Sequence, residues 1–421
     1  MTNRTVHIIG GGTVNHVRPH FALSAPAYGG TARRLKELCE AHDTTMEVRL
    51  HLTKMADHTS NVETNDDLRE LALALVKERT TKIVFMNAAV ADFEGTVEPT
   101  DKTYAIDEDG PAPVHSGRLH SARASEYEVR LRASSKILPL FRNTRKDIFL
   151  VGFKATAAAT SSEQYQQGLD MLKRSSANLV LANDVVTGNN LIITPEEAVY
   201  HETKDREEAL HQLVDMAYLR SHLTFTRSTV VAGEPVAWSS DLVPGNLRTV
   251  VDHCIQAGAY KRFRGVTAGH FAVRLSSDTF LTSRRKTDFN DMARVGLVKV
   301  KTDGPDTVVA YGSRPSVGGQ SQRIVFSEHP GTDCIVHFHC PKKPDSKVPS
   351  VSQREFECGS HQCGENTSRG LSKFGNLYAV YLENHGPNIV FSRDTDPQEV
   401  IDFIEANFDL TQKSGGYQLA A

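Results

Sequence analysis

Three histidines in the second half of the chain have the residue type and spacing of a metal site. His337 and His339 are separated by one residue within an apolar run, and His385 follows a second apolar run, Val380–Leu382. Residues at i and i+2 of a strand point to the same face. Three neutral imidazoles with one open position form a catalytic zinc arrangement, in which the metal acts as a Lewis acid on a substrate oxygen. The spacing also fits ordinary hydrogen-bonded histidines at a strand edge.

A glycine-rich loop near the N-terminus is the second chemical signal. Gly10-Gly11-Gly12-Thr13 follows the strand-like run Val6–Ile9. Glycines there allow backbone N–H groups to approach a phosphate. Any turn between a strand and a helix can carry glycines, so the loop alone leaves an ordinary turn open.

The bulk composition excludes several classes of protein. The chain has 421 residues, 24% of them charged, and a formal net charge of -3, so a dedicated nucleic-acid binder is not expected. No apolar run approaches the roughly eighteen residues of a membrane span. The N-terminus enters a strand-like run at once, and the six cysteines are too few for a disulfide framework. We expect a cytoplasmic protein that contacts no membrane.

Short apolar runs alternate with amphipathic helical patterns over residues 1–222. Helical spacing marks Thr31–His42 and Leu68–Glu78, and nearly continuous apolar runs mark Lys82–Val90, Asp147–Phe153 and Asn178–Val185. This alternation predicts an α/β fold with a doubly wound, Rossmann-like parallel sheet. Ligands of such a fold bind beyond the carboxyl ends of the strands.

The rest of the chain follows a different pattern. Residues 223–245 are rich in Ser, Thr, Gly and Pro and are predicted to connect two domains. Residues 246–421 form the predicted second domain, with one helix from about Asn246 to Tyr260 and another over Pro397–Asn407. Its predicted strands are short: Phe271–Leu275, Thr279–Thr282, Leu297–Lys301, Thr307–Tyr311, Cys334–His339, Leu377–Leu382 and Asn388–Phe391.

The stretch from about Asn246 to Phe391 resembles the class II aldolase/adducin-head family, which includes sugar-phosphate aldolases, epimerases and dehydratases. Thr267–Arg274 is similar to the family's T-A-G-N-x-S-x-R segment, and Phe280–Ser283 to its strand and phosphate-binding turn. His337–His339 matches the metal-binding H-x-H, and Asn384–Gly386 matches the [NH]-H-G. The resemblance implies an α/β domain with a central, mainly antiparallel sheet, Zn²⁺ or another divalent metal on the three histidines, and an oligomer, usually a tetramer.

The chain departs from this family where the family places its acid/base. Ser316-Val317-Gly318 stands where the family has Ser-Ser-Glu, so that carboxylate is missing. His270 replaces the Asn of the glycine turn, and Arg284-Arg285 replaces a small Thr-Gly pair. Two guanidiniums there can hold a phosphate or a carboxylate, or form a solvated turn.

Three other carboxylates are candidates for the missing acid. Glu355 and Glu357 follow the H-x-H, where some dehydratases of the family place their base, and Glu383 lies two residues before His385. Glu355 and Glu357 alternate along Arg354–Cys358, so a strand there would place both on one side. Exposed carboxylates without a role are the alternative for all three.

Residues 6–217 resemble phosphopantothenate–cysteine ligase, which activates a carboxylate with CTP or ATP and couples it to the amine of cysteine. That family carries a Gly-Gly-Thr loop, then A-A-V-A-D, a G-F strand end and A-N-D-V, matched by Asn87–Phe93, Val151–Lys154 and Leu181–Val185. The resemblance implies a pocket for CTP or ATP with Mg²⁺. The expected contacts are Gly10, Gly11, Gly12, Thr13, Ala89, Asp92, Gly152, Phe153, Asn183 and Asp184.

Two positions depart from the ligase pattern. Ser24 stands where the family has the Asn that steadies the acyl-nucleotide, and Gly117–Ser121 stands where it has a mobile lysine clamp. Arg118 of that segment can neutralise a phosphate, although a guanidinium is no simple replacement for a compact ammonium group. These changes favour a different acid substrate, a different reaction, or a fold used only for binding.

Together these patterns predict a bifunctional metabolic enzyme. Its C-terminal half would perform zinc-dependent aldolase, epimerase or dehydratase chemistry on a small phosphorylated or carboxylated hydroxy-carbonyl compound. Its N-terminal half would be a nucleotide-dependent, carboxylate-activating domain. The alternative is a ligase-like, amide-forming enzyme whose aldolase-type domain serves oligomerisation. Expected partners are small-molecule substrates and copies of the same chain in a dimer or tetramer.

Overall fold

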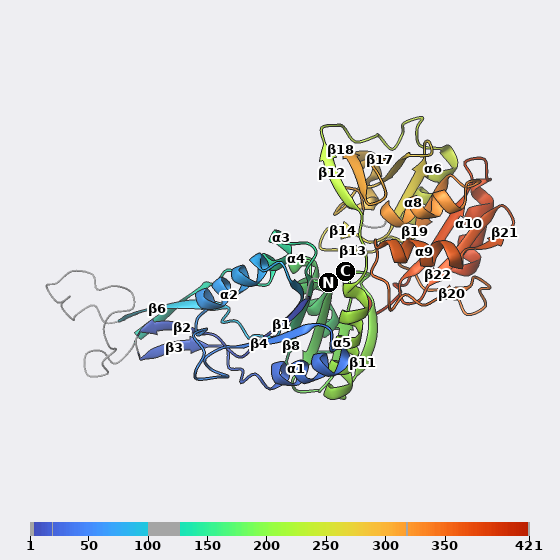
Figure 1. Cartoon of the computed structure of the whole chain (residues 1–421). Coiled ribbons are helices and arrows are strands. Elements are labelled where there is room, and N and C mark those ends of the chain that lie inside the picture. Colours follow the sequence, from blue (N-terminus) through green and yellow to red (C-terminus); the bar gives the residue numbers. More distant parts are fainter. Residues whose placement is uncertain (1–3, 19, 100–126, 317–318, 420–421) are drawn as a thin grey trace. The chain divides into compact units, whose positions relative to one another are not determined.

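The buried apolar runs form the strands of two large β-sheets in the computed structural model (Figure 1). The structure describes residues 4–18, 20–99, 127–316 and 319–419. They divide into two compact units: one takes the residues up to Lys154 with 170–181 and 210–217, and the other takes 155–169, 182–209 and the residues from Tyr218 onward. None of the helices described has both the length and the apolar character that crossing a membrane requires.

The first sheet has seven strands in the order β11-β10-β9-β8-β5-β1-β4. β1 lies parallel to β4 and β5, and β5 lies parallel to β8, whereas β10 and β11 are antiparallel. The doubly wound, Rossmann-like prediction is therefore confirmed. The strands are β1 (Thr5–Gly10), β4 (Glu47–Leu52), β5 (Thr81–Met86), β8 (Phe149–Thr156), β9 (Leu179–Asp184), β10 (Asn190–Ile193) and β11 (Val199–Thr203).

Among the described residues, five helices and two hairpins accompany this sheet in the sequence. The helices are α1 (Gly30–His42), α2 (Asn65–Lys77), α3 (Pro139–Thr144), α4 (Ser161–Ser175) and α5 (Arg206–Ser221). α1 packs on β1 and β4 through Ala32, Leu35, Leu38 and Cys39, which follow a helical period. The hairpins pair β2 (Val14–Arg18) with β3 (Phe21–Ser24), and β6 (Phe93–Pro99) with β7 (Tyr127–Ala133).

The second large sheet has ten strands and is mainly antiparallel, as predicted. Its order is β12-β18-β17-β16-β15-β19-β23-β22-β20, and β21 also pairs with β22. The strands are β12 (Arg227–Val231), β15 (His270–Arg274), β16 (Thr279–Ser283), β17 (Leu297–Thr302), β18 (Thr307–Tyr311), β19 (Cys334–His337), β20 (Ser350–Val351), β21 (Ser372–Phe374), β22 (Leu377–Leu382) and β23 (Gly386–Phe391). β12 comes from the stretch predicted as a connector and pairs with β18.

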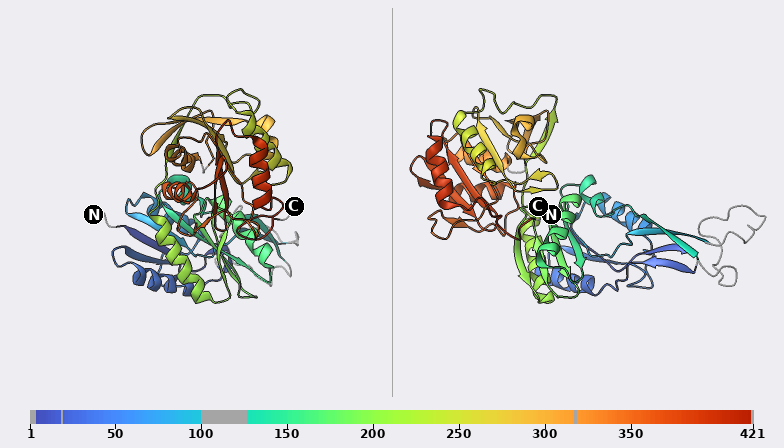
Figure 2. Two further views of the ribbon diagram at one scale, coloured as in Figure 1. Left: turned by 90° about the vertical axis from the view of Figure 1, so that its right-hand side faces the viewer. Right: turned by 180° about the vertical axis from the view of Figure 1, so that it is seen from behind.

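Helices cover both faces of this sheet because its strands alternate apolar side chains between two cores (Figure 2). Phe271 and Val336 face a core shared with α6 and α10, whereas Ala272 and Ile335 face a core shared with α8. α9 lies beside α8 and packs on β22. The helices are α6 (Gly245–Gln256), α7 (Met292–Val295), α8 (Gly319–Glu328), α9 (His361–Gly370) and α10 (Pro397–Asn407), with the 3₁₀ turn η1 (Phe289–Asp291) and the small hairpin β13 (Arg262–Phe263) and β14 (Val266–Thr267).

A buried ion pair anchors two loops of the second unit. The Arg220 guanidinium at the end of α5 lies 3.1 Å from the Glu196 carboxylate, and both side chains are fully buried. Arg220 also donates to the carbonyl of Arg354 at 2.9 Å, and Glu196 accepts the backbone N–H of Cys358 at 2.6 Å. A buried charge is tolerated only when it is paired in this way.

We predict that Glu196→Ala destabilises the second unit by about 3–5 kcal/mol, because it leaves the Arg220 guanidinium buried and uncompensated. Trp238 is the sole tryptophan, lies in the same unit and is 8% exposed, so its fluorescence reports unfolding in urea. The exposed Glu234→Ala is the matched control and should change stability by less than about 0.5 kcal/mol. Equal unfolding curves for the two variants would contradict the anchoring role.

Candidate functional site

The structure brings the three predicted histidines together. His337 is the last residue of β19, His339 follows it, and His385 lies in the turn between β22 and β23. One ring nitrogen from each can be chosen so that all three lie within 4.8 Å of one another. The side chains are 1%, 7% and 1% exposed, so the cluster is almost closed to water.

The Asn-His-Gly turn has a backbone that few other sequences adopt. Asn384 has a φ of 57°, in the left-handed region that asparagine tolerates better than most residues. The N–H of His385 donates to the carbonyl of Leu382 at 3.0 Å. A Cβ on Gly386 would lie 2.1 Å from the carbonyl oxygen of Phe338, so only glycine lets the turn come this close to the segment that carries His337 and His339.

The electrostatics of the cluster suit metal ligation. Burial lowers the pKa of His337 to about 4. Burial, followed by the neighbouring His337, holds the pKa of His385 well below its usual range. A neutral His337 donates Nδ1–H to the carbonyl of Pro387 at 2.7 Å, which leaves the lone pair on Nε2. That Nε2 lies 3.2 Å from Nε2 of His385.

The C-terminal tail holds the histidine segments from outside, which the sequence did not predict. The N–H of Ser414 donates to the carbonyl of His339 at 3.0 Å, and its hydroxyl donates to the carbonyl of His385. Gly415 has a φ of 77° and packs against the carbonyl of Asn384 so closely that a Cβ would lie 1.8 Å from it. No sequence pattern identifies these contacts, because they join positions that have no regular spacing.

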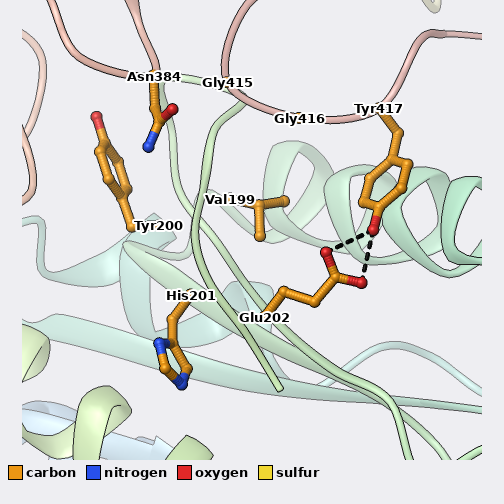
Figure 3. Close-up of a pocket in the computed structure, with 8 residues that line it drawn as sticks. All are labelled: Val199, Tyr200, His201, Glu202, Asn384, Gly415, Gly416 and Tyr417. Carbon is orange, nitrogen blue, oxygen red and sulfur yellow. Dashed lines mark hydrogen bonds between the residues drawn. The ribbon is translucent and has the colours of Figure 1, made fainter. Parts of the chain in front are cut away.

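A small polar pocket of about 270 Å³ lies beside this turn (Figure 3). Its lining includes Asn384, the residue before His385, and Tyr417, whose hydroxyl donates to Glu202 at 2.6 Å. The remaining lining residues are Val199, Tyr200, His201, Gly415 and Gly416. None of the three clustered histidines lines this pocket.

The predicted carboxylates do not join the histidine cluster within the described part of the chain. The expectation that Glu355 and Glu357 share a strand face is wrong, because residues 354–358 form no strand, with turns at 354–355 and 358–359. Gln353 bonds the Phe356 carbonyl through its side chain at 2.8 Å, which satisfies the backbone locally. Glu355 accepts a hydrogen bond from Ser352, and Glu357 is buried. Glu383 is exposed on the turn that carries His385.

Two buried hydroxyls lie near the end of β16. This segment, Phe280–Ser283, is similar to the strand and phosphate-binding turn of the class II aldolase family. Ser283 and Ser316 are 0% and 7% exposed, and the hydroxyl oxygens of both have no hydrogen-bond partner among the described residues. Their backbones are joined by the Ser316 N–H, which donates to the Ser283 carbonyl at 2.8 Å. Arg284 bonds Ser313 and the Val295 carbonyl instead, so its guanidinium orders the turn.

The glycine loop of the first unit packs too tightly for any side chain. A Cβ on Gly10 would lie 2.2 Å from the Ala32 side chain, and one on Gly12 would lie 2.0 Å from the Ala25 carbonyl. Gly11 has a φ of 101°. The loop is therefore fixed by α1 and its flanking segment.

A buried network joins this loop to the segment after β5. Thr13 donates its N–H to the Ala89 carbonyl at 2.9 Å, and its hydroxyl accepts the N–H of Ala91 at 2.8 Å. The same hydroxyl donates to Asn65 at 2.6 Å, and Asn65 donates to the Ala91 carbonyl at 2.8 Å. Asn65, at the start of α2, was not predicted, although a polar residue at the beginning of an apolar helix is a signal that could have identified it.

The other predicted nucleotide contacts differ in exposure. Asp92 is exposed and pairs with Lys136 at 2.5 Å. Gly152 lies in β8, where a Cβ would meet Leu138 and Met171 at 3.2 and 3.3 Å, so this glycine serves packing. Phe153, the next residue, is partly exposed.

The carboxylate of Asp184 accepts hydrogen bonds from the loops around it. Its carboxylate accepts five hydrogen bonds, from the Thr156 hydroxyl and from the backbone N–H groups of Ala158, Ala159, Val186 and Thr187. These bonds, with that of Thr187 the strongest, hold the pKa of Asp184 well below its usual range. Asn183 beside it is partly exposed. Arg118, the predicted phosphate-neutralising residue, lies outside the described residues.

Fold and site define a Rossmann-like α/β domain followed by a mainly antiparallel domain with a three-histidine cluster. The chain belongs to the family of the DNA/pantothenate metabolism flavoprotein C-terminal domain, whose model matches residues 4–217. It also carries a class II aldolase domain, because the model of the class II aldolase and adducin N-terminal domain matches residues 248–343. Both domains thus belong to families of enzymes.

Solved structures similar to this chain include relatives of both domains. One is the DNA/pantothenate metabolism flavoprotein from Streptococcus pneumoniae, with 19% identity over 51% of this chain and 97% of that chain, at a TM-score of 0.41. Another is L-fuculose-1-phosphate aldolase from Thermus thermophilus, with 18% identity over 41% of this chain and 89% of that chain, at a TM-score of 0.29. A search of curated proteins finds no match.

We predict that Gly386→Ala destabilises the second unit by about 2 kcal/mol or more, because the added methyl group meets the Phe338 carbonyl and the residue must keep a φ of 152°. Urea unfolding followed by Trp238 fluorescence measures the loss. Gly331→Ala is the control, since a Cβ there meets nothing within 4 Å. A stability for Gly386→Ala as high as that of the control would contradict the close approach.

Proposed function

We propose that the chain is a bifunctional enzyme whose C-terminal domain uses zinc, or another divalent metal, on a small hydroxy-carbonyl compound. The observation that carries this proposal is the buried cluster of His337, His339 and His385. Tetrahedral zinc with Zn–N bonds of about 2.0–2.1 Å places ligand nitrogens roughly 3.3 Å apart. The 3.2 Å between His337 and His385 fits that spacing. When bound, the metal would polarise a substrate oxygen, which suits aldol cleavage, epimerisation or dehydration.

The chain's own polar groups support an anionic substrate. The buried hydroxyls of Ser283 and Ser316 lack partners among the described residues, and a buried polar group without a partner costs free energy unless a ligand satisfies it. Ser283 ends β16, and β16 pairs with β15, which begins at His270 opposite His337. A phosphate or carboxylate on the substrate would accept hydrogen bonds from both hydroxyls.

Among the three predicted carboxylates, we retain Glu383 as the candidate for proton transfer. It lies on the same turn as His385 and is exposed, so a substrate can reach it. Glu355 is held by Ser352, and Glu357 is buried with its charge acting on Arg220. Both residues are therefore better explained as stabilising their own loop than as acids or bases at the histidine cluster.

We predict about one zinc per purified chain in the wild type and less than about a tenth of that in His339→Ala, because two remaining imidazoles rarely hold a structural or catalytic zinc. Inductively coupled plasma mass spectrometry measures the metal. His329→Ala, a histidine bonded to Ser368 outside the cluster, is the control and should keep the metal. Absence of metal from the wild type, or full retention in His339→Ala, would overturn the zinc proposal.

The N-terminal domain is proposed to bind CTP or ATP with Mg²⁺. The family of this domain, the rigid glycine loop and the Thr13–Asn65 network that positions Ala89 support this assignment. Asp92 and Lys136 are exposed beside that network, so they can exchange their mutual ion pair for contacts with Mg²⁺ and phosphate. Asp184 would act by ordering its loops, since its carboxylate is already saturated with donors.

We predict that Asp92→Ala weakens Mg²⁺-CTP or Mg²⁺-ATP binding about tenfold, the loss of one charge-assisted contact. Isothermal titration calorimetry with each nucleotide measures the affinity. Asp66→Ala, an exposed aspartate at the start of α2, is the control and should bind as the wild type does. Unchanged affinity in Asp92→Ala would remove this residue from the pocket.

The second candidate is a ligase-like, amide-forming enzyme whose aldolase-type domain serves oligomerisation. The match of the ligase-like family to about half of the chain favours it. A metal-free wild type that binds nucleotide and forms a dimer or tetramer would support this candidate over the first. In both cases we propose a homo-oligomer in the cytoplasm, where the free cysteines would stay reduced.

A further inference from the structure

Two cysteines of the second unit lie against each other at the start of α9. Cys363 is in the first turn of this helix, and its N–H donates to the Ser360 hydroxyl at 3.0 Å. The turn before the helix passes through Gly359, whose φ is 87°. It brings Cys358 back so that its thiol donates a hydrogen bond to the sulfur of Cys363. A bond between the two sulfurs would close only the short loop 358–363.

The sulfur of Cys363 accepts from a second donor as well. The side-chain nitrogen of the buried Gln353 lies 3.3 Å from this sulfur. The same nitrogen lies 2.8 Å from the Phe356 carbonyl, which can only accept, so the N–H groups of this amide face both partners. The donors, with Cys358 the strongest, lower the pKa of Cys363 although burial opposes them. Cys363 therefore has thiolate character, and the thiolate is the nucleophilic form of cysteine.

The other four cysteines have a different environment. Cys39, Cys254, Cys334 and Cys340 are each 0% exposed. Burial raises the pKa of Cys254, Cys334 and Cys340, so these three stay thiols and react slowly. In the pair, by contrast, Cys358 is partly exposed and gives access to Cys363, which is 2% exposed.

The pair does not complete a metal site within the part of the chain that the structure describes. The group of three or more His, Cys, Asp and Glu residues that could hold an ion there is the histidine cluster. Two thiols alone are too few for tetrahedral zinc. Two sulfurs in contact, one of them with thiolate character, suit redox chemistry instead.

We propose that Cys358 and Cys363 form a reversible disulfide, in which Cys363 reacts first with a peroxide and Cys358 resolves the product. The Cys363 sulfur attacks one oxygen of hydrogen peroxide, the O–O bond breaks, and the other oxygen takes up a proton and leaves as water. The Cys358 sulfur then attacks the sulfenic sulfur of Cys363, the S–O bond breaks, and a second water leaves. Two thiols thus lose two protons and two electrons, which reduce the peroxide to water.

The disulfide would be transient in a reducing compartment. A dithiol reverses it by exchange, because its thiolate attacks one sulfur of the pair and its second thiol releases the other. Disulfides of proteins in such compartments are mostly of this transient, redox-responsive kind. The proposal depends on neither the metal nor the nucleotide proposed above.

The test exposes the full chain to hydrogen peroxide, alkylates the remaining thiols with iodoacetamide in urea and digests the protein with trypsin. Cleavage after Arg354 and Arg369 places both cysteines in one peptide, Glu355–Arg369. We expect mass spectrometry to show that this peptide loses two hydrogens and both alkylation sites about tenfold faster than any other cysteine peptide is modified. Dithiothreitol should restore both sites.

Two serine variants identify the nucleophile. In Cys358→Ser the hydroxyl can still donate to Cys363, and without the resolving thiol we expect a sulfenic acid on Cys363 that dimedone traps. In Cys363→Ser we expect about tenfold less trapping on Cys358, because this thiol has lost the partner that shares its proton. Trp238 fluorescence shows whether each variant is folded.

Three results count against the proposal. The first is a wild-type peptide that keeps both thiols under peroxide that oxidises free glutathione. The second is oxidation of all six cysteines at one rate, because the arrangement would then confer no selectivity. The third is equal dimedone trapping in the two serine variants, which would remove Cys363 as the nucleophile. If a variant does not fold, the wild-type peptide alone decides whether the disulfide forms.

Discussion

The candidate metal centre depends on one close backbone contact, between Gly386 and the carbonyl of Phe338. This contact brings the turn that carries His385 against the segment that carries His337 and His339. It also starts β23 in register with β19, which places the Pro387 carbonyl where it accepts Nδ1–H of His337. The C-terminal tail makes a second close contact of this kind. Gly415 packs on the carbonyl of Asn384, and Ser414 donates to the carbonyls of His339 and His385. Glycine at two positions thus permits the geometry that three imidazoles require.

The two faces of the second sheet differ in composition: one is apolar, and the other also carries polar side chains. One face contributes aromatic and aliphatic side chains to the core with α6 and α10. The other face, which α8 covers, mixes apolar residues with His270 and His337, and Gln322 of α8 contacts His270 there. Buried polar atoms without partners are costly, and the described residues concentrate several of them near this end of the sheet: Ser283, Ser316 and the oxygen of Gln322. A ligand there would satisfy groups that the protein alone leaves unsatisfied.

The Rossmann-like domain shows how similar residue types serve different tasks. The glycines after β1 are needed because α1 and the Ala25 carbonyl leave no room for a Cβ. Asp184 orders its own loops through five hydrogen bonds and is closed to further donors. Asp92 pairs with the exposed Lys136 and stays accessible to solvent. The carboxylate that is open to solvent is therefore a better candidate for a ligand contact than the one that its own loops surround with donors.

The two fold classes, most strand positions and the three histidines could be predicted from the sequence, because hydrophobic periodicity and the H-x-H and Asn-His-Gly spacings are local. The absence of a strand at residues 354–358 could not, since it depends on side-chain contacts: Gln353 donates to the Phe356 carbonyl, and the Ser352 hydroxyl donates to the Glu355 carboxylate. The residues that support the cluster were set by tertiary packing. Gln322, Ser414 and the ladder position of His270 reach it across long stretches of chain, and such pairings depend on how strands and helices pack, which no local pattern encodes.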